Sequence, residues 1–223
     1  MKLALVDPHA GAARRIWRDL CAAAPPAYFL SPGWIEIWLA SLPRDRALKL
    51  AVLSEHGRPI AACFLGRQLK LRRRVVASRA LFVNTTGVDK FDELCLEYNG
   101  LVGRDLDLHA FVDALRGQWD EVFLPGVPEA AFGGVADAVR RDRRVRVDRR
   151  VPAYHVDLAQ VRARGYPALL SGQTRSQLRR AQREAGATTV EIAASPAAAS
   201  SIYAELVALH LSLIHISEPT RPY

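Results

Sequence analysis

The chain has 223 residues, of which 50% are hydrophobic and 24% are charged. This composition is typical of a globular protein, and the length allows one large domain or two modest ones. No hydrophobic run approaches the length of a membrane-spanning helix, and the N-terminal stretch is too short for a secretory signal.

The net charge of +8 is a weak guide to the partners of the protein. Arginine outnumbers lysine 27 to 4, which is typical of a gene with a GC-rich codon bias. A positive excess can indicate a nucleic-acid partner, but biased arginine usage raises the charge without one. Nucleic-acid binding is therefore not the favoured interpretation.

Three cysteines, Cys21, Cys63 and Cys95, are dispersed along the chain. Their spacing is not that of a zinc site, and it favours reduced thiols in a cytoplasmic protein.

Two helices are predicted near the N-terminus. Asp7 and Pro8 can begin the first, and two consecutive prolines at 25–26 end it. Its apolar face is expected at Ala13, Trp17, Leu20 and Ala24. Ser31 followed by Pro32 is a favoured helix start. The second helix is expected to bury Ile35, Trp38, Leu39 and Leu42.

A β-hairpin is predicted next. Residues 47–54 alternate as a strand does, residues 56–58 form a turn, and residues 60–65 return as a more continuously apolar strand. Three arginines at 72–74 indicate a solvated loop or strand end, and residues 80–83 are a further short apolar run.

An acidic stretch follows at residues 84–100 and ends in an Asn-Gly turn signal. It contains the polar residues Asp92, Glu93, Glu97, Tyr98 and Asn99. Carboxylates this close together could act as a general base or polarise an amine. They could also cap a neighbouring helix or pair with nearby arginines, and this structural alternative is favoured.

The middle of the chain is expected to alternate between helix and strand. Residues 108–119 show the clearest amphipathic periodicity, residues 121–124 read as a strand, and residues 128–139 as a helix weakened by two glycines. The arginine-rich stretch at 140–150 alternates with valines and predicts a strand with one solvated face, which residues 151–158 extend.

A basic helix is predicted at 174–186. Thr174 and Gln177 have the spacing of a capping box, and Gly186 is placed as a C-cap. Its arginines are Arg175, Arg179, Arg180 and Arg183. They form either a solvated surface or a face toward an anion such as a cofactor phosphate or RNA. A short strand at 188–192 and a helix from Ser195-Pro196 to about position 210 follow.

Three segments resemble GNAT-like acyltransferases of the CelD or BcsL type. They are residues 28–34 (YFLSPGW), the pair Asp92-Glu93 together with residues 97–101 (EYNGL), and residues 174–180 (TRSQLRR). The resemblance extends from residue 12 to residue 210. It implies a mixed α/β fold with a central, largely antiparallel sheet flanked by helices, and two GNAT-like modules in tandem, related in architecture to the FemAB transferases. The first module would occupy residues 1–157, and residues 158–210 would begin the second.

The resemblance also implies an acyl-CoA-dependent N- or O-acyltransferase linked to cellulose or exopolysaccharide production. Acetyl-CoA or another acyl-CoA would be the cosubstrate, without a metal, and a small molecule or glycan precursor would be the acceptor. The candidate catalytic residues are Asp92, Glu93, Glu97 and Tyr98. The candidate cofactor-binding residues are Arg175, Arg179 and Arg180.

The phosphate-binding fingerprint usual in GNAT modules is missing. Residues 183–188 come closest and differ at the last position. Either the cofactor module lies mainly after position 210, or the N-terminal module is degenerate and structural. Two other functions stay open: a FemAB-like transferase that uses aminoacyl-tRNA, and a non-catalytic accessory protein of a polysaccharide synthase.

The last segment, residues 211–223, differs in character from the rest. Its first residues alternate as a strand does, and two Xaa-Pro pairs then exclude regular structure. Residues 211–221 resemble the translation of an adapter used in preparing sequencing libraries. The expectation is a truncated, inactive N-terminal part of a transferase whose native sequence ends at His210 or Leu211.

This expectation predicts the result of resequencing the gene. A genomic read across codon 211 should depart from the printed residues 211–223, because adapter sequence is absent from the genome. A read that continues through the same thirteen codons to a natural stop would contradict it.

Overall fold

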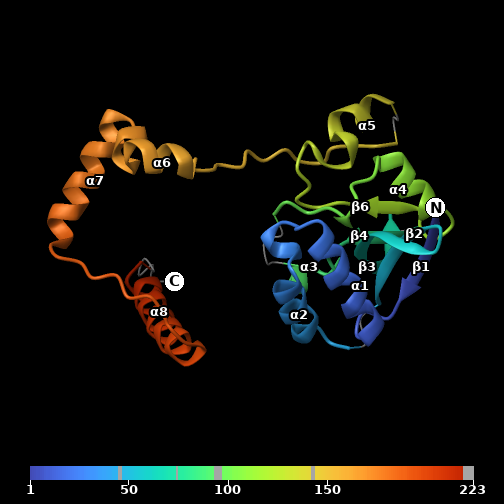
Figure 1. Cartoon of the computed structure of the whole chain (residues 1–223), viewed down its shortest axis with the longest axis horizontal. Coiled ribbons are helices and arrows are strands. Elements are labelled where there is room, and N and C mark those ends of the chain that lie inside the picture. The colour runs from blue at the N-terminus through green and yellow to red at the C-terminus, as the bar shows by residue number, and fades with distance from the viewer. Residues whose placement is uncertain (45–46, 74, 93–96, 142–143, 218–223) are drawn as a thin grey trace. The chain divides into compact units, whose positions relative to one another are not determined.

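A computed structural model describes residues 1–44, 47–73, 75–92, 97–141 and 144–217. The chain divides into two units, residues 1–150 and residues 151–223. Figure 1 labels helices and strands of the chain.

The first unit is built around a six-stranded sheet. Its strands are β1 (Lys2–Val6), β2 (Leu48–Glu55), β3 (Arg58–Arg72), β4 (Val76–Val83), β5 (Val102–Gly103) and β6 (Glu121–Phe123). The order across the sheet is β1-β2-β3-β4-β6, and β5 pairs with β3. All pairs are antiparallel except β4 with β6, which is parallel. The predicted mixed α/β fold with a largely antiparallel sheet is therefore confirmed.

Helices cover both faces of this sheet. The helices of this unit are α1 (Gly11–Ala23), α2 (Pro32–Ser41), α3 (Asp89–Asp92), α4 (Leu108–Ala114) and α5 (Val135–Arg141). Figure 1 shows α1 and α2 on one side of the sheet and α4 on the other. Leu50 and Phe64 pack with the α1 and α2 side, whereas Leu53 and Cys63 pack with the α4 side. Because successive strand residues point to opposite faces and helices cover both, residues 50–53 of β2 and residues 61–66 of β3 are buried without interruption.

The first helix begins later than predicted. Asp7 forms a turn before it, since its Oδ1 accepts a hydrogen bond from the backbone N–H of His9 at 2.8 Å. Ala13, Trp17 and Leu20 of the predicted apolar face are buried, whereas Ala24 is the C-cap and is only partly buried. Trp17 donates its indole N–H to the carbonyl of Leu30 at 3.1 Å. That bond connects α1 to the short 3-10 turn η1 (Tyr28–Leu30), after which α2 begins at Pro32 as predicted.

The predicted hairpin is confirmed, with β2 and β3 joined at His56 and Gly57. Both have positive φ, 50° and 76°, as the tightest hairpin turns require. Strand β3 continues to Arg72, well past the predicted end, and pairs along its outer half with β4.

Two ion pairs connect the outer strands of the sheet. Arg72 pairs with Glu121, and Arg79 pairs with Asp120 at 2.8 Å. Hydrogen bonds from these arginines lower the pKa of both Glu121 and Asp120 to about 2. Because both values are depressed, the pairs stabilise the sheet above about pH 4 and lose this contribution as the pH falls toward 2.

Between residues 108 and 158, the structure has shorter helices and less strand than the sequence predicts. Helix α4 ends at Ala114, so Trp119 lies in the connection to β6. The predicted helix at 128–139 is interrupted between the 3-10 turn η2 (Ala131–Gly133) and α5, where Gly133 and Gly134 have φ of 72° and 100°. The strand predicted at 140–158 is wrong for its described part, because residues 145–156 are irregular. Alternating valines form a strand only where another strand offers backbone hydrogen bonds.

The second unit consists of helices. They are α6 (Leu158–Arg164), the 3-10 turn η3 (Tyr166–Leu169), α7 (Gly172–Ala185) and α8 (Pro196–Ser217). None of the residues from 151 to 212 is buried. The strand predicted at 188–192 is wrong, and Val190 and Ile192 there are 85% and 84% exposed.

Helix α8 begins after Ser195, as predicted, with the Ser195 hydroxyl accepting from the N–H of Ala198 at 3.2 Å. It continues past position 210 to Ser217, so the alternation that starts at Leu211 forms helix and not strand. No helix within the described ranges is long and apolar enough to cross a membrane.

The close approach of β3 to the loop after β4 predicts a severe effect of Gly66→Ala. A Cβ at this position would lie 2.3 Å from the Thr85 carbonyl oxygen and 2.7 Å from the backbone of Thr86. Backbone cannot move aside as a flexible side chain can, so we expect a loss of about 3 kcal/mol in the free energy of unfolding.

Gly33→Ala is the matched control, because nothing lies within 4 Å of its Cβ position on α2. Urea denaturation should show it unchanged or stabilised by up to about 1 kcal/mol. Equal stability of the two variants would contradict the described approach.

Candidate functional site

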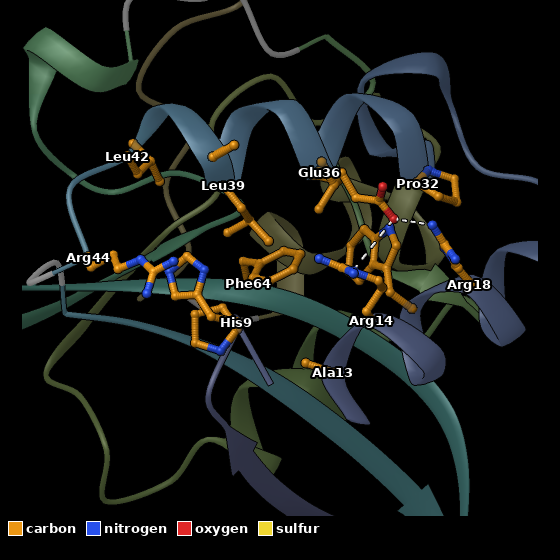
Figure 2. Close-up of a pocket in the computed structure, with 14 residues that line it drawn as sticks. His9, Ala13, Arg14, Arg18, Pro32, Glu36, Leu39, Leu42, Arg44 and Phe64 are labelled. Atoms are coloured by element: carbon orange, nitrogen blue, oxygen red, sulfur yellow. Dashed lines mark hydrogen bonds and ion pairs between the residues drawn. The ribbon is translucent and has the colours of Figure 1, made fainter. Parts of the chain in front are cut away.

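A groove of about 360 Å³ lies between α1 and α2 in the first unit (Figure 2). We call it the α1–α2 groove. Its apolar lining includes Trp17, Ile35 and Phe64, which are all buried, and the partly buried Leu39. The hollow exists because small alanines, Ala13 and Ala40, line it from the two helices. A volume of this size is in the range of small-molecule sites.

Charged side chains surround this apolar lining. Figure 2 shows His9 and Arg44 at one end of the groove and Arg14, Arg18 and Glu36 at the other. Glu36 accepts from the Arg18 guanidinium at 2.6 Å and lies 3.9 Å from Nε of Arg14. The lining therefore holds three guanidinium groups, of Arg14, Arg18 and Arg44, and one carboxylate, which gives the groove an excess of positive charge.

The sequence predicted the buried faces of these helices but not the groove. Arg14 and Arg18 lie one turn apart on α1, and Glu36 follows on α2. This spacing puts both arginines on one face of α1, where they can reach the same carboxylate. It is inconspicuous in a chain with 27 arginines.

A buried polar network fills the space where the pairing of the parallel strands β4 and β6 ends. We call this space the fork. The ladder between them ends at the pair Phe82 and Phe123. Beyond it, the side-chain amide of Asn99 donates to the carbonyl oxygens of Val83 and Pro125, at 2.9 and 2.8 Å. Asn99 therefore occupies the space between the two strand ends.

Asn84 connects Asn99 to the centre of the sheet. Its amide nitrogen donates to Oδ1 of Asn99 and to the carbonyl of Gly100, both at 2.7 Å. Its Oδ1 accepts from the backbone N–H of Phe64 at 2.8 Å. The two asparagines are 3% and 1% exposed, and each is well satisfied. Such a network rigidifies its surroundings, since a missing partner would be costly.

The acidic candidates do not converge on one site. Asp92 accepts from the N–H and hydroxyl of Thr86, at 2.8 and 2.9 Å, and from the N–H of Gly87 at 2.6 Å. Its carboxylate holds the turn after β4. Glu97 and Tyr98 are exposed beside the buried Asn99, and Glu93 lies outside the described residues.

The candidate arginines belong to α7 in the second unit. The N-cap of α7 is Ser171, whose hydroxyl accepts from the N–H of Thr174 at 3.2 Å, so the predicted capping box is wrong. The predicted C-cap is confirmed, with φ of 70° at Gly186. Arg175 donates to the Leu170 carbonyl at 3.0 Å.

The two remaining candidates on α7 differ in their surroundings. Arg180 pairs with Glu184 at 2.7 Å. Arg179 is exposed.

The described thiols are unsuited to nucleophilic chemistry. Cys21 and Cys63 are free and buried. Burial raises the pKa of Cys21 to about 11, and it raises the pKa of Cys63 further. Both are therefore protonated at neutral pH, and the thiolate is the reactive form. Within the described ranges, no three His, Cys, Asp or Glu side chains are grouped to hold a metal ion.

Comparisons with protein-family models, with curated proteins and with solved structures found no match. What the structure defines is a fold class, a largely antiparallel sheet with helices on both faces. The features of this fold that bear on function are the α1–α2 groove, the closed fork and the exposed arginines.

The fork predicts that Asn99→Asp is strongly destabilising although it preserves shape. A carboxylate cannot donate, so the carbonyls of Val83 and Pro125 would each lose a bond and face a negative charge. We expect a loss of about 3 kcal/mol in the free energy of unfolding at pH 7. The unpaired site would raise the pKa of the new carboxyl group in the folded state. The loss should therefore be smaller below about pH 4, where this group is protonated, and should grow as the pH rises.

Tyr98→Phe is the control for this variant. Tyr98 is the neighbouring residue and is 49% exposed, so its hydroxyl should contribute less than about 0.5 kcal/mol. Chemical denaturation of both variants between pH 3 and pH 8 measures the difference. An Asn99→Asp protein as stable as Tyr98→Phe at pH 7 would show that Asn99 does not hold the fork.

Proposed function

We propose that the protein takes part in acyl transfer from acyl-CoA, and that residues 1–150 support this reaction without binding the thioester. The observation that carries the proposal is the fork between β4 and β6. Ligands of open sheets bind beyond the carboxyl ends of the strands, at a change in strand order. The central sheet of a GNAT module is splayed, and the only parallel pair among the described strands diverges beyond Phe82 and Phe123.

In this chain the fork is occupied by protein. Asn99 fills it and bonds to both strand ends. Asn99 also belongs to residues 97–101, one of the segments that resemble GNAT-like acyltransferases. This coincidence supports the interpretation of the first unit as a degenerate GNAT-like module, in which the filled fork serves stability and the acyl donor binds to another part of the protein.

Acyl transfer needs a base beside the acceptor and a site for the anionic donor. The acceptor amine or hydroxyl attacks the thioester carbonyl, the C–S bond breaks, and the thiol of CoA leaves with the acceptor proton. Asp92 is a poor candidate for the base, because its oxygens already accept three hydrogen bonds. Glu97 and Tyr98 are exposed and remain the acceptor-side candidates.

The proposal assigns the phosphates of CoA to α7, and to Arg179 in particular. A guanidinium is well suited to a phosphate because it donates two parallel hydrogen bonds. Arg175 and Arg180 are engaged with Leu170 and Glu184, respectively. Arg179 is exposed on the same helix.

Calorimetric titration of acetyl-CoA and a longer acyl-CoA tests the proposal, using the protein expressed from its complete reading frame. We expect binding that Arg179→Gln weakens about tenfold, because one charge-assisted contact is lost. Arg162→Gln, an equally charged change on α6, should leave the affinity unchanged. Absence of binding to both thioesters would overturn the proposal. Binding to charged tRNA that weakens steeply with salt, without binding to acyl-CoA, would replace it with the aminoacyl-tRNA alternative.

A further inference from the structure

We infer that the α1–α2 groove is a binding site for a small organic acid, a carboxylate carried on an apolar body. This inference is independent of the proposed transferase function, because the groove lies on the face covered by α1 and α2, and none of its lining residues is a candidate for acyl transfer. The shape, the charge and the rigidity of the groove support the inference.

The shape provides room for an apolar body. Two helices that lie next to each other on a sheet normally fill the seam between them with interlocking side chains. Here Ala13 and Ala40 leave a hollow of about 360 Å³, and Phe64 and Leu39 line it. An apolar group entering this hollow would exchange water for hydrocarbon and aromatic contacts, which is favourable in proportion to the area buried.

The charge selects an anion. Glu36 is already bonded to Arg18, so a second carboxylate would meet the remaining positive charge of Arg14 and Arg44. Guanidinium groups bind carboxylates through paired, charge-assisted hydrogen bonds. Figure 2 shows Arg44 beside His9 at the end of the groove away from Glu36, with Phe64 between the two ends. A ligand with its carboxylate at Arg44 would therefore lay its apolar body along Leu39 and Ala40, apolar lining residues that are not fully buried.

The walls of the groove are held in place by bonds outside it. The Trp17 indole N–H donates to the Leu30 carbonyl, and its ring packs on Phe64 with centroids 4.8 Å apart. The backbone of Phe64 is bonded to both the backbone and the side chain of Asn84. A site whose walls are fixed before the ligand arrives loses little entropy on binding.

Titration calorimetry of the full chain with two acids and their neutral counterparts tests the inference. The probes are octanoate with octanol, and 2-naphthoate with 2-naphthalenemethanol. We expect at least one acid to bind, and its neutral counterpart to bind at least about tenfold more weakly, because it lacks the charge-assisted contact. Binding of octanoate alone identifies an aliphatic acid, binding of naphthoate alone an aromatic one, and binding of both a site selective for charge.

Two variants and a control locate the binding. Arg44→Gln should weaken the acid about tenfold, whereas Arg15→Gln should leave it unchanged, because Arg15 is exposed on α1 outside the groove lining. Ala40→Trp fills the hollow from an exposed position and should abolish binding while the thermal unfolding temperature is kept. The inference is overturned if neither acid binds, if the neutral counterparts bind equally well, or if Arg44→Gln and Arg15→Gln have the same effect. Full binding by a folded Ala40→Trp protein would also overturn it.

Discussion

The hydrogen bonds of Asn84 and Asn99 are the constraint on which the first unit depends. They join β3, the end of β4 and the segment after β6 at one buried point. The parallel ladder between β4 and β6 is only three residue pairs long. Its strand ends would present unpaired carbonyls to the interior without Asn99. A buried carbonyl without a donor costs stability, so the network is a condition of the fold.

The fork between β4 and β6 is closed by Asn99. The position that an open sheet usually offers to a ligand is therefore filled by this side chain. Of the acidic candidates, Asp92 holds a turn and Glu97 is exposed. The α1–α2 groove differs in kind, because its charges surround a hollow and do not close one. Phe64 connects the buried network with the α1–α2 groove. Its backbone bonds to Asn84 of the network, and its side chain lines the groove.

In the second unit, the helices depend on local signals and not on a buried network. Their local signals are strong: Ser171 and Ser195 begin α7 and α8, and Gly186 ends α7. Their side chains are nevertheless exposed or only partly buried. Helices need no partner for their backbone hydrogen bonds, so they form where the predicted strand at 188–192 does not. The difference between these two predictions lies in where the backbone bonds go.

The sequence by itself determined the starts of α2 and α8, the C-cap of α7 and the β2–β3 hairpin. These depend on caps, turn residues and periodicity, which act within a few residues. It also singled out the stretch from 84 to 100, but for its acids and not for Asn84 and Asn99. Only the tertiary structure decided that Asn99 fills the fork, that Asp92 holds a turn, and that Arg14, Arg18 and Arg44 face one groove. The bonds of Asn99 span up to 26 positions in the chain, and the groove joins two helices and a strand. Such contacts have no local pattern, because the sheet that brings the residues together must form first.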